Sequence, residues 1–260
     1  MSEIDKLIEM IKDSKKIVFF GGAGVSTESG LKDFRSSDGL YNEKYKYPPE
    51  EVLSHSFFIN HTGAFYDFYR DKLNPNNYKP NVTHYVLSKM EHNNMLSSVI
   101  TQNIDGFHQD AGSSNVLELH GSVKRNYCMK CHRFYSDDVI FNSTGIPKCD
   151  CGGIIKPDVV LYEEGLNESV IKKTINEIST CDLLIIGGTS LNVYPAASFI
   201  NYFRGKYLVL INKSITQYDH ICNLVIHDSI GKVFESIEKS LFWYGPRFLD
   251  IGNEVFICQN

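Results

Sequence analysis

Short apolar runs alternate with stretches of helical periodicity along most of this chain, and this alternation strongly constrains the fold. The runs are Ile17–Phe20, Ser98–Thr101, Leu183–Ile186, Leu208–Ile211 and Leu224–Ile226. Nearly continuous apolarity is typical of parallel strands that are covered on both faces. Helical patterns lie between or after these runs, at Asn167–Ile178, Pro195–Phe203 and 230–241. The sequence therefore predicts an α/β fold with a Rossmann-like, doubly wound parallel sheet.

Two segments interrupt the alternation and predict a second, smaller domain. One is rich in Tyr, Asn and Pro with a helical stretch near Ala64–Leu73, and the other carries four closely spaced cysteines. We expect a large discontinuous nucleotide-binding domain and a small domain made of a helical and a cysteine-rich insertion. The large domain would comprise residues 1–35, 81–123 and 157–242, and the small one residues 36–80 and 124–156, with the tail 243–260 unassigned.

Composition excludes several classes of function. The chain has 26 basic and 31 acidic residues and a net charge of −5, which argues against a general nucleic-acid binder. No apolar run approaches the ~20 residues of a membrane-spanning helix, and the N-terminal stretch lacks the features of a signal peptide. We therefore expect a cytoplasmic protein without a nucleic-acid or membrane partner. The sequence does not set the oligomeric state, for which a monomer is favoured.

A glycine-rich turn, Gly21–Gly24, directly follows the first apolar run. Such a turn can bring backbone N–H groups against a pyrophosphate. The usual dinucleotide fingerprint has a third glycine where Thr27 stands, so the turn alone does not indicate a hydride-transfer dehydrogenase. The residues beyond it provide hydroxyls, an acid, an aromatic ring and a guanidinium, all suited to a bound dinucleotide; they are Ser26, Ser29, Asp33, Phe34 and Arg35.

Other polar stretches follow later strands, and each has a plain structural alternative. Thr101–Asp105 places amide and carboxylate groups at the carboxyl edge of the sheet, or Asn103 and Asp105 there simply cap a helix. Gly187–Ser190 has the alternative of an ordinary glycine-containing connection. His120 alone proves little, because most lone histidines are packed or solvated.

Taken together, these stretches resemble the sirtuins, the NAD-dependent protein lysine deacylases, in their bacterial form. The motifs run in order through the chain: GAGVSTESGLKDFR at 22–35, TQNIDGFHQDAG at 101–112, ELHGS at 118–122, IIKPDVVLYEE at 154–164, GGTSLNVYPAA at 187–197 and LIN at 210–212. The resemblance implies a large domain around a parallel sheet, a small zinc domain, and NAD bound between them. It implies that NAD is consumed while acetyl groups are removed from lysines of proteins or peptides, giving nicotinamide, 2′-O-acetyl-ADP-ribose and free lysine.

The resemblance also implies roles for individual residues. His120 would be the catalytic base, which suits an imidazole with an ordinary pKa of about 6.5. Asn103 would orient the ribose and the attacking water, and Gln102 would contact that ribose. The nicotinamide pocket would contain Ile104 and Asp105, Phe34 would shield the reacting carbon, and Arg35 would hold the cofactor loop. Further NAD contacts would come from Gly22, Ala23, Gly24, Thr27, Gly188, Thr189, Ser190, Asn212, Lys213 and Ile230, and the substrate peptide would pair with Val159, Val160 and Leu161.

The spacing Cys128-x₂-Cys131-x₁₇-Cys149-x-Cys151 is close to that of a four-thiolate zinc ribbon. The second pair is one residue short, so a redox dithiol or unliganded buried thiols stay open as alternatives. Four thiolates leave no open coordination position, and one structural Zn²⁺ per chain is therefore expected.

Alternative functions use the same residues. A longer-chain deacylase or a mono-ADP-ribosyltransferase needs no new NAD pocket, and a non-catalytic NAD sensor or a zinc-ribbon interaction module belongs to another class. Sirtuins that prefer acidic acyl groups carry Tyr-x-x-Arg in the first insertion. Here Arg70 stands four residues after Tyr66, which moves the cation by about 100° on a helix and disfavours desuccinylation.

Overall fold

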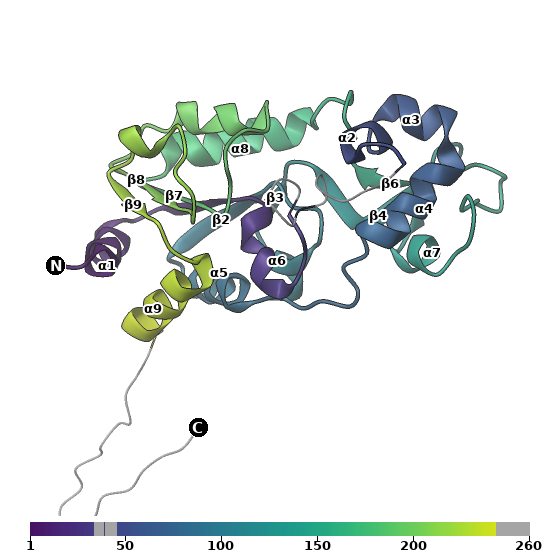
Figure 1. Cartoon of the computed structure of the whole chain (residues 1–260). Helices are drawn as coiled ribbons and strands as arrows, with labels where there is room; N and C mark the ends of the chain where they lie inside the picture. The colour runs from purple at the N-terminus through teal and green to yellow at the C-terminus, as the bar shows by residue number, and fades with distance from the viewer. Residues whose placement is uncertain (34–38, 40–45, 243–260) are drawn as a thin grey trace, which may run out of the picture.

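The computed structural model describes residues 1–33, 39 and 46–242 (Figure 1). Phe34, Arg35 and the tail 243–260 lie outside the described residues. Within them, no helix has the length and apolar character required to cross a lipid bilayer.

A six-stranded sheet in the order β3-β2-β1-β7-β8-β9 forms the larger part of the molecule. All neighbouring strands in it run parallel, which confirms the predicted fold class. The central strands β1 and β7 are buried along their whole length, as their continuous apolarity predicts. The strands are β1 (Ile17–Gly21), β2 (Leu96–Thr101), β3 (Val116–Glu118), β7 (Leu183–Gly187), β8 (Tyr207–Ile211) and β9 (Leu224–Ile226).

Helices cover both faces of this sheet, because alternate residues of each strand point to opposite sides. Phe19 and Ile185 belong to a core cluster shared with α1 (Glu3–Asp13), α5 (Val82–His92) and α9 (Ile230–Phe242). The ring of Phe19 meets that of Phe234 edge to face, with centroids 5.7 Å apart. On the other face, Phe20 and Ile186 pack against α8 (Glu168–Thr180) and the 3₁₀ helix η4 (Ala196–Tyr202). The predicted helical stretch 195–203 is thus a tighter helix than an α-helix.

A second, three-stranded antiparallel sheet has the order β5-β4-β6. Its strands are β4 (Gly121–Cys128), β5 (Phe134–Tyr135) and β6 (Ile155–Val159). Short helices pack beside it around a separate aromatic core that includes Phe58, Phe65 and Tyr69. These helices are α2 (Pro49–Val52), α3 (His55–Asn60), α4 (Thr62–Lys72) and α7 (Asp138–Phe141), and α4 contains most of the helical stretch predicted near 64–73. Figure 1 shows this part at one end of the molecule, beside the carboxyl ends of the parallel strands.

Candidate active site

Two glycine turns touch where the strand order reverses, between β1 and β7. The Gly22 N–H donates to the Gly187 carbonyl over 3.2 Å, and the Gly24 N–H donates to the Gly188 carbonyl over 2.8 Å. A Cβ atom on Gly24 would lie 2.8 Å from the Gly188 Cα atom, so only glycine permits this approach. In open α/β sheets, ligands bind in the crevice at such a reversal. The close packing of the glycines therefore shapes the crevice, and the N–H groups of Gly22 and Gly24 are used in hydrogen bonds between the two turns.

Side chains from the ends of β2 and β7 meet above these turns. The Gln102 amide donates to the Thr189 hydroxyl over 3.2 Å, and this hydroxyl also accepts the Leu191 N–H over 3.1 Å. Thr189 is buried and Ser190 beside it is exposed. Thr27 donates its hydroxyl hydrogen bond to the Gly24 carbonyl over 3.0 Å. Gln102, Thr189 and Thr27 thus lie at one edge of the sheet.

The Ser26 hydroxyl connects two predicted site residues. It donates to the Asp105 carboxylate (Oδ2) over 2.8 Å and accepts from the Asn103 side-chain amide over 3.0 Å. Ser26 is 2 % exposed, so this contact is shielded from water. Sequence reasoning noted the hydroxyl near the glycine turn but did not include Ser26 among the cofactor-binding residues. No local pattern shows that residues 79 apart in the chain meet.

Asp105 has a second partner, the Phe107 N–H, which donates to Oδ1 over 2.9 Å. The helix-capping alternative does not hold for Asp105, because the N-cap of α6 (Phe107–Asp110) is Gly106 and this helix has no side-chain cap. Burial raises the pKa of Asp105, and the hydrogen bonds from Phe107 and Ser26 act against that rise. A carboxylate has about four acceptor sites, so Asp105 can still accept from a ligand. Ile104, its neighbour, packs against the aromatic core of the smaller sheet.

His120 lies in the short turn between β3 and β4. Its Nδ1 atom is 2.8 Å from the Gln102 carbonyl oxygen. A carbonyl only accepts, so the ring carries its proton on Nδ1 and leaves Nε2 unprotonated when neutral. Burial lowers the pKa of His120, and the Gln102 carbonyl acts in the opposite direction. The neutral form is therefore favoured, as a general base requires.

The predicted adenosine-side residues follow β7, β8 and β9. The Gly188 N–H binds the Ile211 carbonyl over 3.1 Å, and the Asn212 N–H binds the Ile226 carbonyl over 3.1 Å. Lys213 is exposed. Ile230 is 4 % exposed and packs in the core, where a Cβ on Gly187 would lie 2.6 Å from its Cδ1 atom. Its side chain is thus engaged with the protein.

The predicted peptide segment continues β6. Val159 and Leu161 are buried and Val160 is partly exposed. The Val160 N–H donates to the His120 carbonyl over 3.0 Å, which places this segment directly beside the candidate base.

The cysteines of both pairs converge at one point. The Sγ atoms of all four lie within 4.8 Å of one another, with Cys128–Cys151 at 3.4 Å and Cys131–Cys149 at 3.5 Å. Tetrahedral zinc with Zn–S bonds of about 2.3 Å needs sulfurs about 3.8 Å apart. The set therefore fits one zinc ion despite the short second pair, with no position left for a catalytic water.

The Sir2 family model matches residues 22–195. The chain belongs to the Sir2 family. This sirtuin is 60% identical over 239 residues to the NAD-dependent protein deacetylase of Clostridium perfringens and 57% identical over 241 residues to that of Clostridium acetobutylicum. These matches cover 90% and 91% of this chain and 98% of each relative.

Solved structures agree with this assignment. A Sir2 variant with a deacetylated p53 peptide and 3′-O-acetyl ADP ribose is similar at a TM-score of 0.85 and 34% identity. Sir2 with a p53 peptide and NAD⁺ is similar at a TM-score of 0.82 and 35% identity. Each match covers 92% of this chain and 98% of the other.

In this sirtuin, Tyr66 and Arg70 are engaged in the smaller part of the molecule. The buried Tyr66 hydroxyl donates to the Ile155 carbonyl over 2.6 Å. Arg70 donates to the Ile140 carbonyl over 2.9 Å and to the Ser143 hydroxyl over 3.0 Å. Both groups are thus hydrogen-bonded within the protein.

Proposed function

We propose that this Sir2-family chain is an NAD-dependent protein lysine deacetylase that yields nicotinamide, 2′-O-acetyl-ADP-ribose and free lysine. Relatives at 57% and 60% identity are named NAD-dependent protein deacetylase, and similar Sir2 structures contain NAD⁺ or an acetylated peptide. Acetylated lysines of proteins or peptides are therefore the substrates.

The contact between His120 Nδ1 and the Gln102 carbonyl is the observation that carries this proposal. It fixes the tautomer that leaves Nε2 ready to accept a proton, at the edge of the sheet where the glycine turns shape a crevice. A non-catalytic NAD sensor would need the crevice but would not need His120 with an unprotonated Nε2 beside it.

The remaining roles follow from the same edge of the sheet. When bound, NAD supplies the ribose that receives the acetyl group and nicotinamide as the leaving group. His120 accepts a proton at Nε2, Asn103 and Gln102 orient the ribose, and Asp105 accepts from the carboxamide. Ile104 forms part of that pocket, and Phe34 and Arg35, outside the described residues, keep their predicted roles.

We assign the other contacts as the sequence predicts. Gly22, Ala23, Gly24 and Thr27 would line the phosphates, Gly188, Thr189, Ser190, Asn212, Lys213 and Ile230 the adenosine side, and Val159, Val160 and Leu161 the peptide. Zinc on Cys128, Cys131, Cys149 and Cys151 would hold the small sheet together and take no part in bond making. The domain boundaries given above, a cytoplasmic location and a monomeric state complete the proposal.

Mass spectrometry of a reaction with NAD and an acetylated peptide tests this function. We expect nicotinamide and acetyl-ADP-ribose in equal amounts, with loss of one acetyl group from the peptide. A protein that gains ADP-ribose would instead identify a mono-ADP-ribosyltransferase, and NAD that stays intact would identify a sensor.

A further inference from the structure

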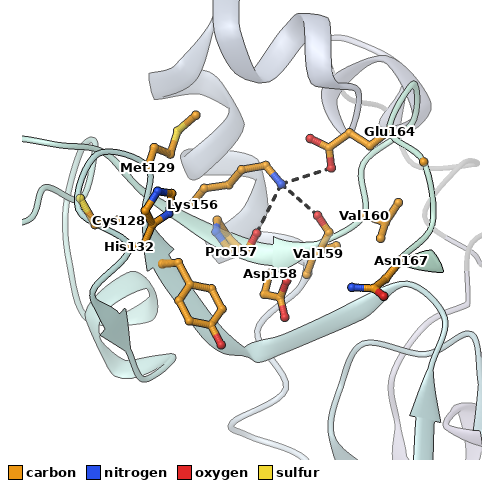
Figure 2. Close-up of a pocket in the computed structure, with 12 residues that line it drawn as sticks. Cys128, Met129, His132, Lys156, Pro157, Asp158, Val159, Val160, Glu164 and Asn167 are labelled. Carbon is orange, nitrogen blue, oxygen red and sulfur yellow. Dashed lines mark hydrogen bonds and ion pairs between the residues drawn. The ribbon is translucent and has the colours of Figure 1, made fainter. Parts of the chain in front are cut away.

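A groove of about 350 Å³ lies beside β6, between the cysteine cluster and the segment that follows the strand (Figure 2). β6 is an edge strand of this three-stranded sheet: the Ile155 N–H at its start donates to the Pro147 carbonyl over 3.0 Å, and no strand of the described residues pairs with its outer side from Pro157 onward. Exposed edges of this kind invite pairing with another chain unless side chains protect them. The groups that meet the edge of β6 therefore determine how an extended peptide can approach.

Lys156 protects the carbonyl groups of this edge. Its ammonium group donates to the Pro157 carbonyl over 3.4 Å and to the Val159 carbonyl over 3.1 Å. It also forms an ion pair with Glu164 over 3.2 Å, and Figure 2 shows the three contacts converging on one nitrogen. Because an ammonium group has three donors, Lys156 is fully used in this way.

The Glu164 carboxylate connects three elements. Oε2 accepts from Lys156 on β6 and from the Leu161 N–H over 2.9 Å, and Oε1 lies 2.9 Å from Nδ1 of His55 on α3. The side chains of Lys156 and Glu164 are only 20% and 22% exposed, so water screens their interaction weakly. Lys156 and Glu164 together bind the Pro157 and Val159 carbonyls and the Leu161 N–H on this edge.

Glu163 fastens the same segment to the start of α3. Its φ angle is +74°, a left-handed conformation that a residue other than glycine adopts at a cost. Its carboxylate accepts the Ser56 N–H over 2.9 Å and the Ser56 hydroxyl. The backbone of the segment is held at the same place, because the Tyr162 N–H donates to the Leu53 carbonyl, just before α3, over 2.9 Å.

The opposite side of the segment contacts the candidate base, through the Val160 N–H and the His120 carbonyl. We propose that Glu164, with its partner Lys156 and with Glu163, positions the segment Val159–Leu161 against the acylated peptide without touching the reacting atoms. This inference rests on the proposed function and goes beyond it, because it assigns peptide affinity to an ion pair on the far side of the segment. Loss of the pair should loosen the segment and leave the NAD crevice unchanged.

The test compares Glu164→Gln, Lys156→Met and the double variant in steady-state deacetylation. We expect each single variant to raise the KM for acetylated peptide about tenfold, the loss of one charge-assisted contact, while kcat and the KM for NAD stay within about twofold. Because the two residues act on one segment, the double variant should raise the KM no more than the larger single effect. Glu163→Gly should also raise the peptide KM, because glycine adopts the positive φ angle without strain but cannot accept the hydrogen bonds from Ser56.

Glu168→Gln and Lys172→Met are the matched controls, since this exposed pair lies on α8 with a separation of 3.9 Å. Zinc content and thermal unfolding are measured for every variant to show that each one folds. An unchanged peptide KM in folded variants, or equal changes in the controls, would overturn the inference. A wild-type protein without deacetylation would instead refute the proposed function, so the two failures are distinguishable.

Discussion

The Ser26 hydroxyl stands between Asn103 and Asp105, giving a hydrogen bond to the acid over 2.8 Å and receiving one from the amide over 3.0 Å. The two partners are proposed to hold opposite parts of one nicotinamide riboside unit. A single buried oxygen therefore sets the spacing between the group that orients the sugar and the group that holds the leaving base.

Replacing this oxygen should harm NAD use more than folding. Ser26→Ala leaves the buried Asp105 carboxylate and the partly buried Asn103 amide each short of one partner, at a cost of about 1–3 kcal/mol for the buried group. We expect kcat/KM for NAD to fall at least about tenfold in steady-state assays, with the peptide KM little changed. Ser179→Ala, at a partly exposed position of α8, is the control, and equal losses in both variants would contradict the assigned role.

The pH dependence should report His120. The base must be unprotonated, so activity falls as the pH drops through its pKa, which burial holds below the ordinary value of about 6.5. The acidic limb of kcat/KM should therefore lie below pH ~6.5. His120→Ala should lower kcat by about 10²–10⁴-fold without changing thermal unfolding. A limb above pH ~7, or an active variant, would exclude His120 as the base.

Two other histidines should control stability. His84 and His108 are buried with ring centroids 4.7 Å apart, and His84 Nε2 and both His108 nitrogens have no hydrogen-bond partner among the described residues. Burial lowers the pKa of His84 to about 4 and that of His108 well below its usual value.

The sign of the effect follows from proton binding. The unfolded chain binds these protons with a pKa of about 6.5, so the free energy of unfolding should decrease as the pH falls from about 6.5 toward 4, by up to about 3 kcal/mol for His84. Urea unfolding between pH 7 and 5 measures this. His84→Gln should flatten the curve, whereas the exposed His220→Gln should not, and a flat wild-type curve would refute the prediction.

Zinc removal should unfold the smaller sheet. Cys149→Ser takes one of four thiolates from the cluster, so metal content should fall from about one ion per chain and the melting temperature should drop. Metal analysis and calorimetry check both. Cys222→Ser, outside the cluster, should change neither. Wild-type protein purified without zinc would contradict the assignment.

Sequence patterns located the parallel strands because burial on both faces leaves a continuous apolar signature, as in Leu183–Ile186. They did not reveal α5, in which the polar residues Thr83, His84 and Ser88 are buried among apolar ones and blur the helical period. They also missed β4, whose register with β6 shifts between Ser122 and Asn126 and so interrupts the alternation.

The site residues that could be predicted are those that stand in a recognisable sequence motif and have side chains suited to the chemistry. His120, Asn103, Asp105 and the four cysteines were named from sequence. The Ser26 contacts and the Lys156–Glu164 pair were not, since each depends on how distant or successive segments fold. Spacing also could not show that the Cys149–Cys151 pair fits the tetrahedral arrangement, because this depends on how the fold brings that pair to Cys128 and Cys131.

The strand β4 begins at Gly121, immediately after His120, and ends at Cys128 in the metal cluster. One eight-residue strand therefore joins the base to a metal ligand. A chelator or thiol oxidant that acts on the cysteine cluster would therefore also disturb the strand that positions the His120 imidazole. Such a small molecule would inhibit the enzyme without competing with NAD for its binding site.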